Sequence, residues 1–517
     1  MNEPEPQGQV VIDGGPLTPD EVVALAHRRS RPLLAPSVGE RMAAARRIVE
    51  EAVAGDEIVY GITTGFGALS TTRVEPEEAA ELQVNLLRSH AAGVGPPVAD
   101  ELVRAMLALR ARTLAQGHSG VRTEIVTRLV EMLDQDLLPV VPSQGSVGAS
   151  GDLAPFAHLA LPIIGEGFLK VDGKTVPSAD ALAERNLPPL RLQAKEGLSL
   201  LNGTEGMLAM GVLGLDRARR LAHAADIACG LSVEALLASA RPFRPDIHAL
   251  RPHPGQIESA RCIASVIEGS EIVASHADDF HHAVQDAYCL RCAPQVHGAV
   301  LDTLDHVESV LVRELGSVVD NPIVFPETGE VVSGGNFHGQ PLAFVLDFMA
   351  IAVTELGSIS ERRTDRTLDP QHSAGLPAFL AARPGVNSGY MIAQYTAAAL
   401  VAENRVLAHP ASVESIPTSG SQEDHVSMGW GAGRKLSQVL DNTSLVIAIE
   451  LICAAQGLEY RLPRRPGVIA RGILKGIRDL VPPLIADRSV GREIEDIARF
   501  IEDGTLEARY AGAAPGS

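Results

Sequence analysis

Aromatic residues and basic charge are both scarce in this sequence of 517 residues. Phe, Trp and Tyr together make up 3%, and 44 lysines and arginines face 64 aspartates and glutamates, for a formal net charge of −20. Because no basic tract offsets this charge, nucleic acid and anionic membrane surfaces are disfavoured as partners. Alanine and leucine are abundant where aromatics are few, a composition that favours close-packed helices over sheets.

Signals for secretion, disulfides and membrane insertion are also missing. Five cysteines, an odd number in so long a chain, suit a reducing compartment. The N-terminus, MNEPEPQGQV, has neither the basic nor the apolar region of a signal peptide. The longest apolar stretches, 342–353 and 445–456, contain Asp347 and Glu450, which argues against membrane-spanning helices. We therefore expect a soluble, cytoplasmic, globular protein.

Helical periodicity dominates what is present. Apolar residues recur at helical spacing over 125–133 and 300–315. Segments 389–408 and 436–458 are almost continuously apolar, as in helices buried on most sides. Segment 167–178 predicts a single small hairpin. The fold class predicted is mainly α: a large bundle of long helices, with an N-terminal part that carries the active-site loops.

Few linkers interrupt the chain, so four parts of one globular body are expected. Residues 1–15 are a loose N-terminus, and residues 16–240 form the N-terminal part with the candidate catalytic loops. Residues 241–465 form the central long-helix bundle. Residues 466–517 form a C-terminal helical piece, which begins within the proline-rich stretch LPRRPGV.

The stretch GSVGASGDLAP, residues 145–155, concentrates glycine and serine before an apolar segment. Asp152 is a favourable N-cap and Pro155 suits a first helical turn, so a helix is predicted to begin at Leu153. A phosphate loop fits poorly, because no GxxxxGK[ST] pattern is present and the preceding LLPVVPSQ contains two prolines. A plain structural turn is the ordinary alternative for such a cluster.

Ala149-Ser150-Gly151 within this stretch admits a rarer chemistry. The Gly151 nitrogen, with no side chain to block its approach, can attack the carbonyl of Ala149. Water leaves the resulting ring, and Ser150 then loses its hydroxyl and its α-hydrogen as a second water, which leaves an exocyclic methylidene group. The product is an electrophile made from the backbone itself, although the spacing of three small residues does not prove it.

An ordered series of motifs carries a family resemblance. The motifs are YGITTGFG (60–67), NLLRSHAAGVG (85–95), GSVGASGDLAPFAHLAL (145–161), EGLSLLNGTEGM (196–207), QDAYCLRCAPQVHGA (285–299), DNPIVF (320–325), GGNFHGQPLA (334–343) and QEDHVSMG (422–429). As a set they resemble the histidine and aromatic amino acid ammonia-lyase family, and SHAAG and QEDHVSM resemble its histidine branch.

That resemblance implies a reaction, a prosthetic group and an assembly. The reaction is elimination of ammonia from L-histidine to give trans-urocanate, the first step of histidine degradation. The group is 4-methylidene-imidazol-5-one, formed autocatalytically from Ala149, Ser150 and Gly151, with no metal required. The assembly is a homotetramer with shared active sites. A tyrosine or phenylalanine lyase, or an aminomutase on the same scaffold, is the alternative enzyme, and a helical scaffold without activity is the alternative class.

The resemblance also assigns catalytic roles to two tyrosines, Tyr60 and Tyr288. Tyr60 would remove the β-proton of the substrate. A phenol has an ordinary pKa of about 10, so cationic surroundings would have to hold Tyr60 as phenolate. Gly61, Gly65 and Gly67 around it are candidate hinges of a loop that closes over substrate. Without the other motifs, Tyr60 would be taken for a half-buried loop aromatic.

Substrate-binding roles implied by the resemblance fall on His90, Asn202, Gln285, Arg291, Asn321, Phe337 and Glu423. An arginine such as Arg291 has the geometry to hold a carboxylate bidentately, and it lies three residues from Tyr288, on the same helix face. His90 and Glu423 are residue types that can hold an imidazole ring. Each residue also has an ordinary alternative: a surface ion pair for Arg291, a turn for the asparagines, a core position for Phe337.

Metal-binding patterns are weak. HADDFHH (276–282) contains His276, His281 and His282, but such clusters on an acidic surface are usually solvated. Cys289 and Cys292 form a lone CxxC without a second pair. We predict no metal site.

Overall fold

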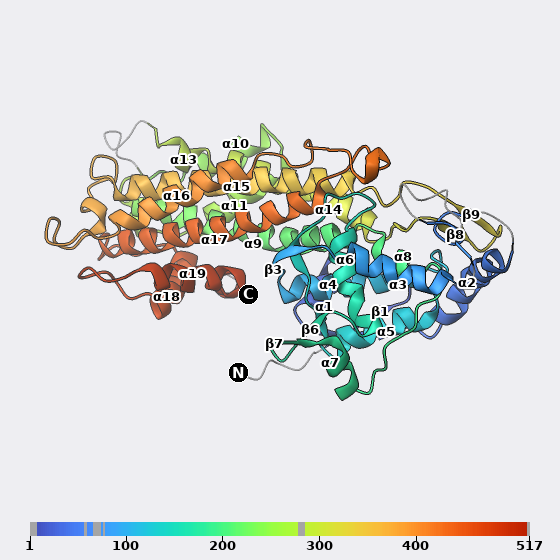
Figure 1. The fold of residues 1–517 in the computed structure, drawn as a ribbon. Helices are drawn as coiled ribbons and strands as arrows, with labels where there is room; N and C mark the ends of the chain where they lie inside the picture. The colour runs from blue at the N-terminus through green and yellow to red at the C-terminus, as the bar shows by residue number, and fades with distance from the viewer. Residues whose placement is uncertain (1–7, 56–58, 66–73, 76–77, 278–284, 514–517) are drawn as a thin grey trace. The chain divides into compact units, whose positions relative to one another are not determined.

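A computed structural model describes residues 8–55, 59–65, 74–75, 78–277 and 285–513. Most of these residues are helical and the strands are short, which confirms the predicted fold class (Figure 1). The chain divides into two compact units, each built from three stretches. Unit 1 comprises residues 1–213, 308–347 and 410–434, and unit 2 comprises residues 214–307, 348–409 and 435–517. The four-part division at residues 15, 240 and 465 stays a prediction.

Unit 1 contains the short elements that surround the Ala-Ser-Gly stretch. Its helices include α1 (Pro19–Ala26), α2 (Val38–Ala54), α3 (Ala79–His90), α4 (Asp100–Ala115), α5 (Thr123–Asp134), α6 (Leu153–Ala160), α7 (Ser178–Glu184) and α8 (Glu196–Leu201). Its strands include β1 (Gly8–Ile12), β2 (Ser30–Leu34), β3 (Val94–Pro97), β4 (Leu138–Pro139), β5 (Pro142–Gln144), β6 (Phe168–Val171), β7 (Lys174–Pro177), β8 (Ile323–Phe325) and β9 (Glu330–Val332).

Unit 2 consists of helices and loops, and no β-strand lies among its described residues. Its helices include α10 (Pro245–Ala249), α11 (Pro254–Val266), α12 (Glu271–Ala274), α13 (Tyr288–Arg291), α16 (Met391–Leu407), α18 (Val468–Leu480), α19 (Gly491–Glu502) and α20 (Thr505–Ala513). The longest helices run from a stretch of one unit into a stretch of the other: α9 (Glu205–Ala235), α14 (Ala293–Glu314), α15 (Gln340–Leu368) and α17 (Gly429–Glu459).

Helix burial follows the apolar periodicity. On α5, Ile125, Leu129 and Leu133 are buried on one face, and the helix packs against α4. The stripe over 300–315 is buried along α14 and just beyond it. Helices α15 and α17 are long and apolar enough to cross a membrane, but 72% and 83% of their most apolar windows are buried inside the protein. Both are therefore core helices of the protein.

The predicted hairpin at 167–178 is present as β6 and β7. The strands are antiparallel, with Phe168 opposite Pro177 and Val171 opposite Lys174. Asp172 and Gly173 form the turn with φ values of 47° and 76°, the left-handed conformations that a two-residue type I′ turn needs.

Helix α16 is only partly buried within the single chain. The sequence predicts burial on most sides, yet the face buried in the chain consists largely of small residues such as Ala393 and Ala397. Its larger apolar side chains Ile392, Tyr395 and Val406 are 61%, 60% and 74% exposed. The small residues allow close helix packing on one face, so the bulky apolar residues are left on the other.

Candidate active site

A sharp backbone turn lies at Ala149-Ser150-Gly151, between β5 and α6. Ser150 and Gly151 both have positive φ, at 51° and 83°. For serine this left-handed conformation costs about 1–2 kcal/mol, which the surrounding structure must offset. The backbone angles of Ser150 set how close the Gly151 nitrogen comes to the Ala149 carbonyl carbon, the two atoms that a ring closure would join, and its φ of 51° turns the chain sharply at this point.

Glycine is required at position 151 by close packing against Gly203. A Cβ atom placed on Gly151 would lie 2.0 Å from the Gly203 carbonyl oxygen, far inside van der Waals contact. The amide of Asp152 donates to the same oxygen at 2.8 Å. Gly151, the residue that would supply the attacking nitrogen, is thus in close contact with the backbone of Gly203. The turn fits the proposed prosthetic group.

Asp152 is fully buried beside the turn, and its role differs from the predicted cap. Helix α6 begins at Leu153 as predicted, but the Asp152 carboxyl makes no capping bond to it. It accepts instead from the Met207 amide at 2.8 Å. Burial, together with the smaller effect of the nearby Glu205, raises the pKa of Asp152 to about 7, against the opposing effects of the amide bonds and of Arg110.

Arg110, on α4, holds the segment that carries Asn202. Its guanidinium donates to the Glu205 carboxylate at 2.5 Å and to the Asn202 carbonyl at 2.7 Å. Both charged side chains are at most 2% exposed. A Cβ on Gly203 would lie 2.0 Å from this guanidinium. The backbone at Gly203 is therefore packed between Arg110 on one side and Gly151 on the other.

Asn202 and Asn321 are brought together. The Asn202 side-chain amide donates to the Asn321 carbonyl at 2.7 Å, and the Asn321 side-chain oxygen accepts from the Gly334 amide at 2.9 Å. Just behind them, Lys195 and Asp320 form a fully buried ion pair at 2.8 Å. The two predicted site asparagines therefore share one polar cluster close to Gly203.

His90 ends helix α3 and lies within electrostatic reach of Glu423. Its Nδ1 atom lies 2.9 Å from the Leu86 carbonyl oxygen, and since a carbonyl only accepts, Nδ1 carries the proton. Burial lowers the pKa of His90, against the opposing effects of that carbonyl and of Glu423. The neutral ring is therefore favoured near neutral pH, with Nε2 as an acceptor.

Glu423 has an unpaired oxygen. Its Oε2 atom is buried and has no hydrogen-bond partner among the residues that the structure describes. The backbone of its segment joins the Ala-Ser-Gly stretch, because the Met428 amide donates to the Val147 carbonyl at 2.9 Å. A buried carboxylate oxygen without a donor is costly, so a donor that reached this oxygen would bind favourably.

Tyr60 is half-buried in a loop packed on the core of unit 1. Ile62 fills a cluster with Ala45, Val49 and Val324, and the Gly61 amide donates to the Thr64 hydroxyl at 3.2 Å. Gly61 has φ of 70°, as a turn glycine needs. Gly67, the third candidate hinge, lies outside the described residues. The role of Tyr60 in removing the β-proton stays a prediction.

Phe337 lies in the loop before α15 and is half-buried. The neighbouring His338 ring stacks on His425 with centroids 5.8 Å apart, and its Nε2 lies 3.2 Å from the His425 carbonyl oxygen. The Phe337 segment therefore lies close to the segment of Glu423. The substrate-binding role of Phe337 stays a prediction.

Gln285, Tyr288 and Arg291 form a cluster in unit 2. Arg291 donates to the Gln285 side-chain oxygen at 2.8 Å, and its guanidinium carbon lies 4.6 Å from the Tyr288 ring centroid. Tyr288 is 71% exposed. The three side chains are already assembled on one face of α13 and the chain before it. The remaining predicted site residues lie in unit 1.

Buried charged residues beside the predicted site were not predicted. They are Arg110, Lys195, Glu205 and Asp320. One signal in the sequence was available: Arg110 stands in the apolar run LALRARTLA. Arginine is rarely fully buried without a partner, so an arginine at this place indicates a buried ion pair. Its partner Glu205 is distant in sequence and cannot be paired with it by spacing.

Metal-ligand clusters are absent from the described residues, within which no group of at least three His, Cys, Asp or Glu side chains could hold an ion. His276 faces the carbonyl oxygens of Ile272 and Ala238 at 3.0 Å and 3.2 Å. His281 and His282 lie outside the described residues. All five cysteines are free thiols.

Comparison with known proteins places these motifs in one family. The family model for aromatic amino acid lyase matches residues 17–479. Histidine ammonia-lyase of Gloeobacter violaceus is 54% identical over 497 residues, which cover 96% of each chain. Histidine ammonia-lyase from Trypanosoma cruzi has a TM-score of 0.90 at 42% identity, covering 98% of this chain and 96% of its own. Tyrosine aminomutase from Streptomyces globisporus has a TM-score of 0.93 at 39% identity, covering 98% and 99%. The chain belongs to the aromatic amino acid lyase family.

Proposed function

We propose that this chain is an ammonia-lyase that converts L-histidine into trans-urocanate and ammonia. Relatives about half identical over nearly the whole chain carry that name, which supports the reaction and the substrate. The observation that carries the substrate choice is the buried, unpartnered Glu423 oxygen beside His90. An imidazole ring supplies an N–H donor for it, whereas phenyl supplies none.

Ala149, Ser150 and Gly151 are proposed to form the methylidene-imidazolone group in this chain. When formed, the group supplies an electrophile that captures the substrate's α-amine and so turns ammonia into a better leaving group. The left-handed backbone at Ser150 and the close contact of Gly151 with Gly203, which only glycine allows, support this assignment. No metal ion has a part in the proposal.

The substrate groups are proposed to be held by the side chains that the family resemblance names. Arg291, with Gln285 and Tyr288 beside it, binds the carboxylate, because a guanidinium matches a carboxylate bidentately. Tyr60 takes the β-proton, and Tyr288 is a second catalytic tyrosine. Asn202 and Asn321 orient the substrate, and Phe337 excludes water near the reacting carbon.

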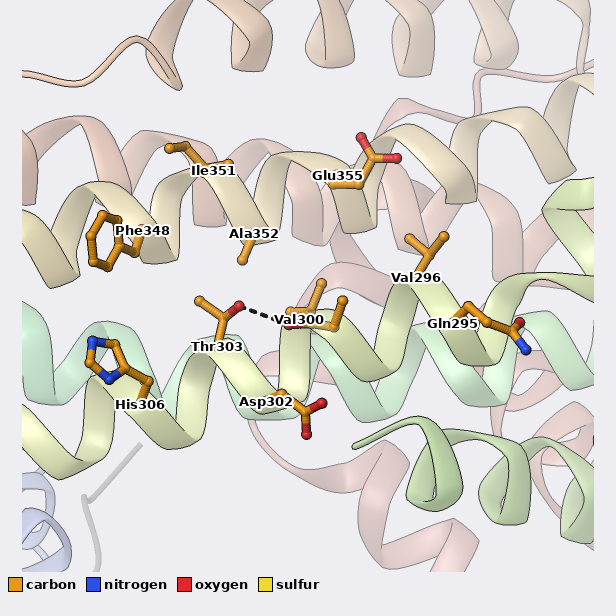
Figure 2. Close-up of a pocket in the computed structure, with 11 residues that line it drawn as sticks. Gln295, Val296, Val300, Asp302, Thr303, His306, Phe348, Ile351, Ala352 and Glu355 are labelled. Atoms are coloured by element: carbon orange, nitrogen blue, oxygen red, sulfur yellow. Dashed lines mark hydrogen bonds between the residues drawn. The ribbon is translucent and has the colours of Figure 1, made fainter. Parts of the chain in front are cut away.

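A homotetramer with shared sites is proposed on the basis of exposed apolar helix faces. Besides α16, the faces of α14 and α15 in unit 2 line a groove of about 700 Å³, where Val296 and Val300 face Ala352 (Figure 2). Phe348 and Ile351 along it are 42% and 45% exposed. Apolar patches of this kind mark protein–protein contacts, and the exposed Tyr288 is proposed to complete the site of a neighbouring copy.

Sedimentation tests the assembly. The protein is expected to sediment as a tetramer, and mixtures of inactive Tyr60→Phe and Tyr288→Phe subunits are expected to regain part of the activity after reassembly. A fully active monomer at low concentration would show that each chain holds a complete site.

Substrate assays test the function. Purified protein is incubated separately with histidine, tyrosine and phenylalanine, and the conjugated acid is followed by its ultraviolet absorbance. Urocanate from histidine is expected, with far slower reaction of the other two. Preference for tyrosine would favour the tyrosine lyase or aminomutase alternative, which the likeness to tyrosine aminomutase keeps open.

A further inference from the structure

A buried charged network crosses the helical core of unit 2. Glu450, on α17, accepts from Arg363, on α15, at 2.5 Å to Nε and 2.8 Å to Nη2. The hydroxyls of Ser232 and Ser360 donate to the same carboxylate at 2.7 Å and 2.6 Å. The two charged side chains are at most 1% exposed. Fixed donors therefore surround the carboxylate, which holds the guanidinium in one orientation.

His297 extends the network. Arg363 Nη1 lies 3.2 Å from His297 Nε2, and since a guanidinium only donates, Nε2 is the acceptor. Nδ1 then carries the proton and donates to Asp226 at 2.7 Å. Ser259 donates to the same Asp226 oxygen. The plane of the guanidinium is thus set from two sides, by Glu450 and by His297.

One hydrogen bond leaves this network for the main chain of α13. The same Nη1 atom of Arg363 donates to the carbonyl of Cys289 at 3.3 Å. Helix α13 is a single turn, separated from α14 by Cys292 alone. Its Leu290 lies in a core cluster with Cys229 and Ala293, against which the Cys289 side chain also packs. Tyr288 and Arg291 occupy the same turn. A turn this short has little rigidity of its own, so its anchors decide where those side chains lie.

A contribution to the stability of the fold does not by itself explain why this buried charged network is present. Replacing a buried ion pair by apolar side chains of similar volume is often neutral or stabilising, because desolvation offsets the attraction. What an apolar core cannot provide is a directed bond to a carbonyl at a defined place. A rigid guanidinium provides it.

We propose that Arg363 is a positioning residue, which fixes α13 through the Cys289 carbonyl and thereby orients Tyr288 and Arg291 toward the substrate. The proposal rests on the proposed function, in which those two side chains act on the amino acid. Because the contact is to the main chain, no substitution at Cys289 removes it. The test must therefore change Arg363.

Arg363→Lys is the first variant, since it keeps the charge against Glu450 and loses the planar fork. Arg478→Lys is the matched control: Arg478 also pairs with a glutamate, Glu459 at 2.9 Å, and donates to a carbonyl, Val481 at 3.1 Å, away from α13. Hydrogen exchange over 287–293 is measured in the assembled enzyme, together with KM and kcat for histidine.

In Arg363→Lys, we expect the amides of α13 to exchange about tenfold faster or more, and kcat/KM to fall about 10- to 100-fold, with KM affected more than kcat. The KM effect is larger because Arg291 binds the carboxylate in the ground state. The control variant is expected to leave both quantities within about twofold. The mass change at Ser150 is expected to be unaltered in both.

If Arg363→Lys does not fold, Arg363→Met combined with Glu450→Gln removes both charges and keeps partners for the serines. Unchanged exchange at α13 in a folded variant would overturn the proposal whatever the activity. Faster exchange with kinetics equal to the control would overturn the link from α13 to the substrate. If the parent enzyme does not act on histidine, the proposed function fails, and the exchange data still decide whether Arg363 holds α13.

Discussion

Removing the Glu423 carboxyl is expected to change catalysis and stability in opposite directions. In the protein without substrate, the buried Oε2 atom of Glu423 has no hydrogen-bond donor among the described residues. In the complex proposed here, an imidazole N–H of the substrate donates to it. Glu423→Ala therefore removes an interaction that exists only with substrate bound, and a cost that exists only without it.

The magnitude follows from the type of hydrogen bond. A bond to a charged group contributes about 1.5–3 kcal/mol, so histidine kcat/KM should fall about 10- to 150-fold. An unpaired buried oxygen costs about 1–3 kcal/mol, part of which is recovered when the side chain is truncated. The substrate-free variant should therefore be at least as stable as the parent, despite the lost packing. Phenylalanine kcat/KM should stay level or rise.

The assay compares kcat/KM for histidine and phenylalanine, the thermal unfolding midpoint without substrate, and the intact mass. Asp424→Asn is the control, because Asp424 is the neighbouring acidic residue and is exposed. It should leave all the values within about twofold of the parent. The intact mass should match the parent after allowance for the substitution, because Glu423 does not take part in building the electrophile. Histidine turnover by Glu423→Ala equal to that of the parent would refute the imidazole-binding role.

Three further predictions concern the turn, the pH dependence and metals. Gly151→Ala would place a Cβ 2.0 Å from the Gly203 carbonyl oxygen, so we expect loss of turnover and of the mass change at Ser150. Gly173→Ala is its control, because Gly173 has a similar φ of 76° but a Cβ there would have no atom within 4 Å. The control should keep the mass change at Ser150 and the activity of the parent. The same result for Gly151→Ala would contradict the packing argument. The raised pKa of Asp152, about 7, means that the folded protein binds a proton that the unfolded chain has lost, so stability should fall as pH rises from about 4 to 7. Asp152→Asn should make the thermal midpoint depend less on pH over that window, and the free energy of unfolding involved is at most about 4 kcal/mol. An unchanged slope of the midpoint against pH would argue against the burial effect. Chelation should leave histidine turnover intact, whereas loss on chelation with recovery on zinc would point to the histidines at 276–282.

Periodic apolar patterns predicted the helices well, because burial repeats with the helix itself. The stripes over 125–133 and 300–315 are buried as expected. The turn of the hairpin was predictable for a local reason, since Asp172 and Gly173 tolerate the left-handed conformations that it needs. Local chemistry was misleading at Asp152, where the predicted cap loses to a bond with the distant Met207 amide.

The features that the sequence could not predict are mostly contacts between residues far apart in the chain. Arg110 with Glu205, Lys195 with Asp320, and Arg363 with Glu450 are buried ion pairs of residues far apart in the chain. Charged residues are usually exposed, so a single sequence favours the surface for each of them. The site residues in motifs were identifiable through family resemblance, whereas their contacts, such as Asn202 with the Asn321 carbonyl, required coordinates.

The mass of the intact protein, measured on the same sample as its turnover of histidine, tests most directly whether Ala149-Ser150-Gly151 forms the electrophile. The account predicts a parent chain lighter than its sequence by two waters and active on histidine. It predicts a Ser150→Ala chain that regains one or both waters and does not turn over. A parent chain of full sequence mass with normal histidine turnover would contradict it.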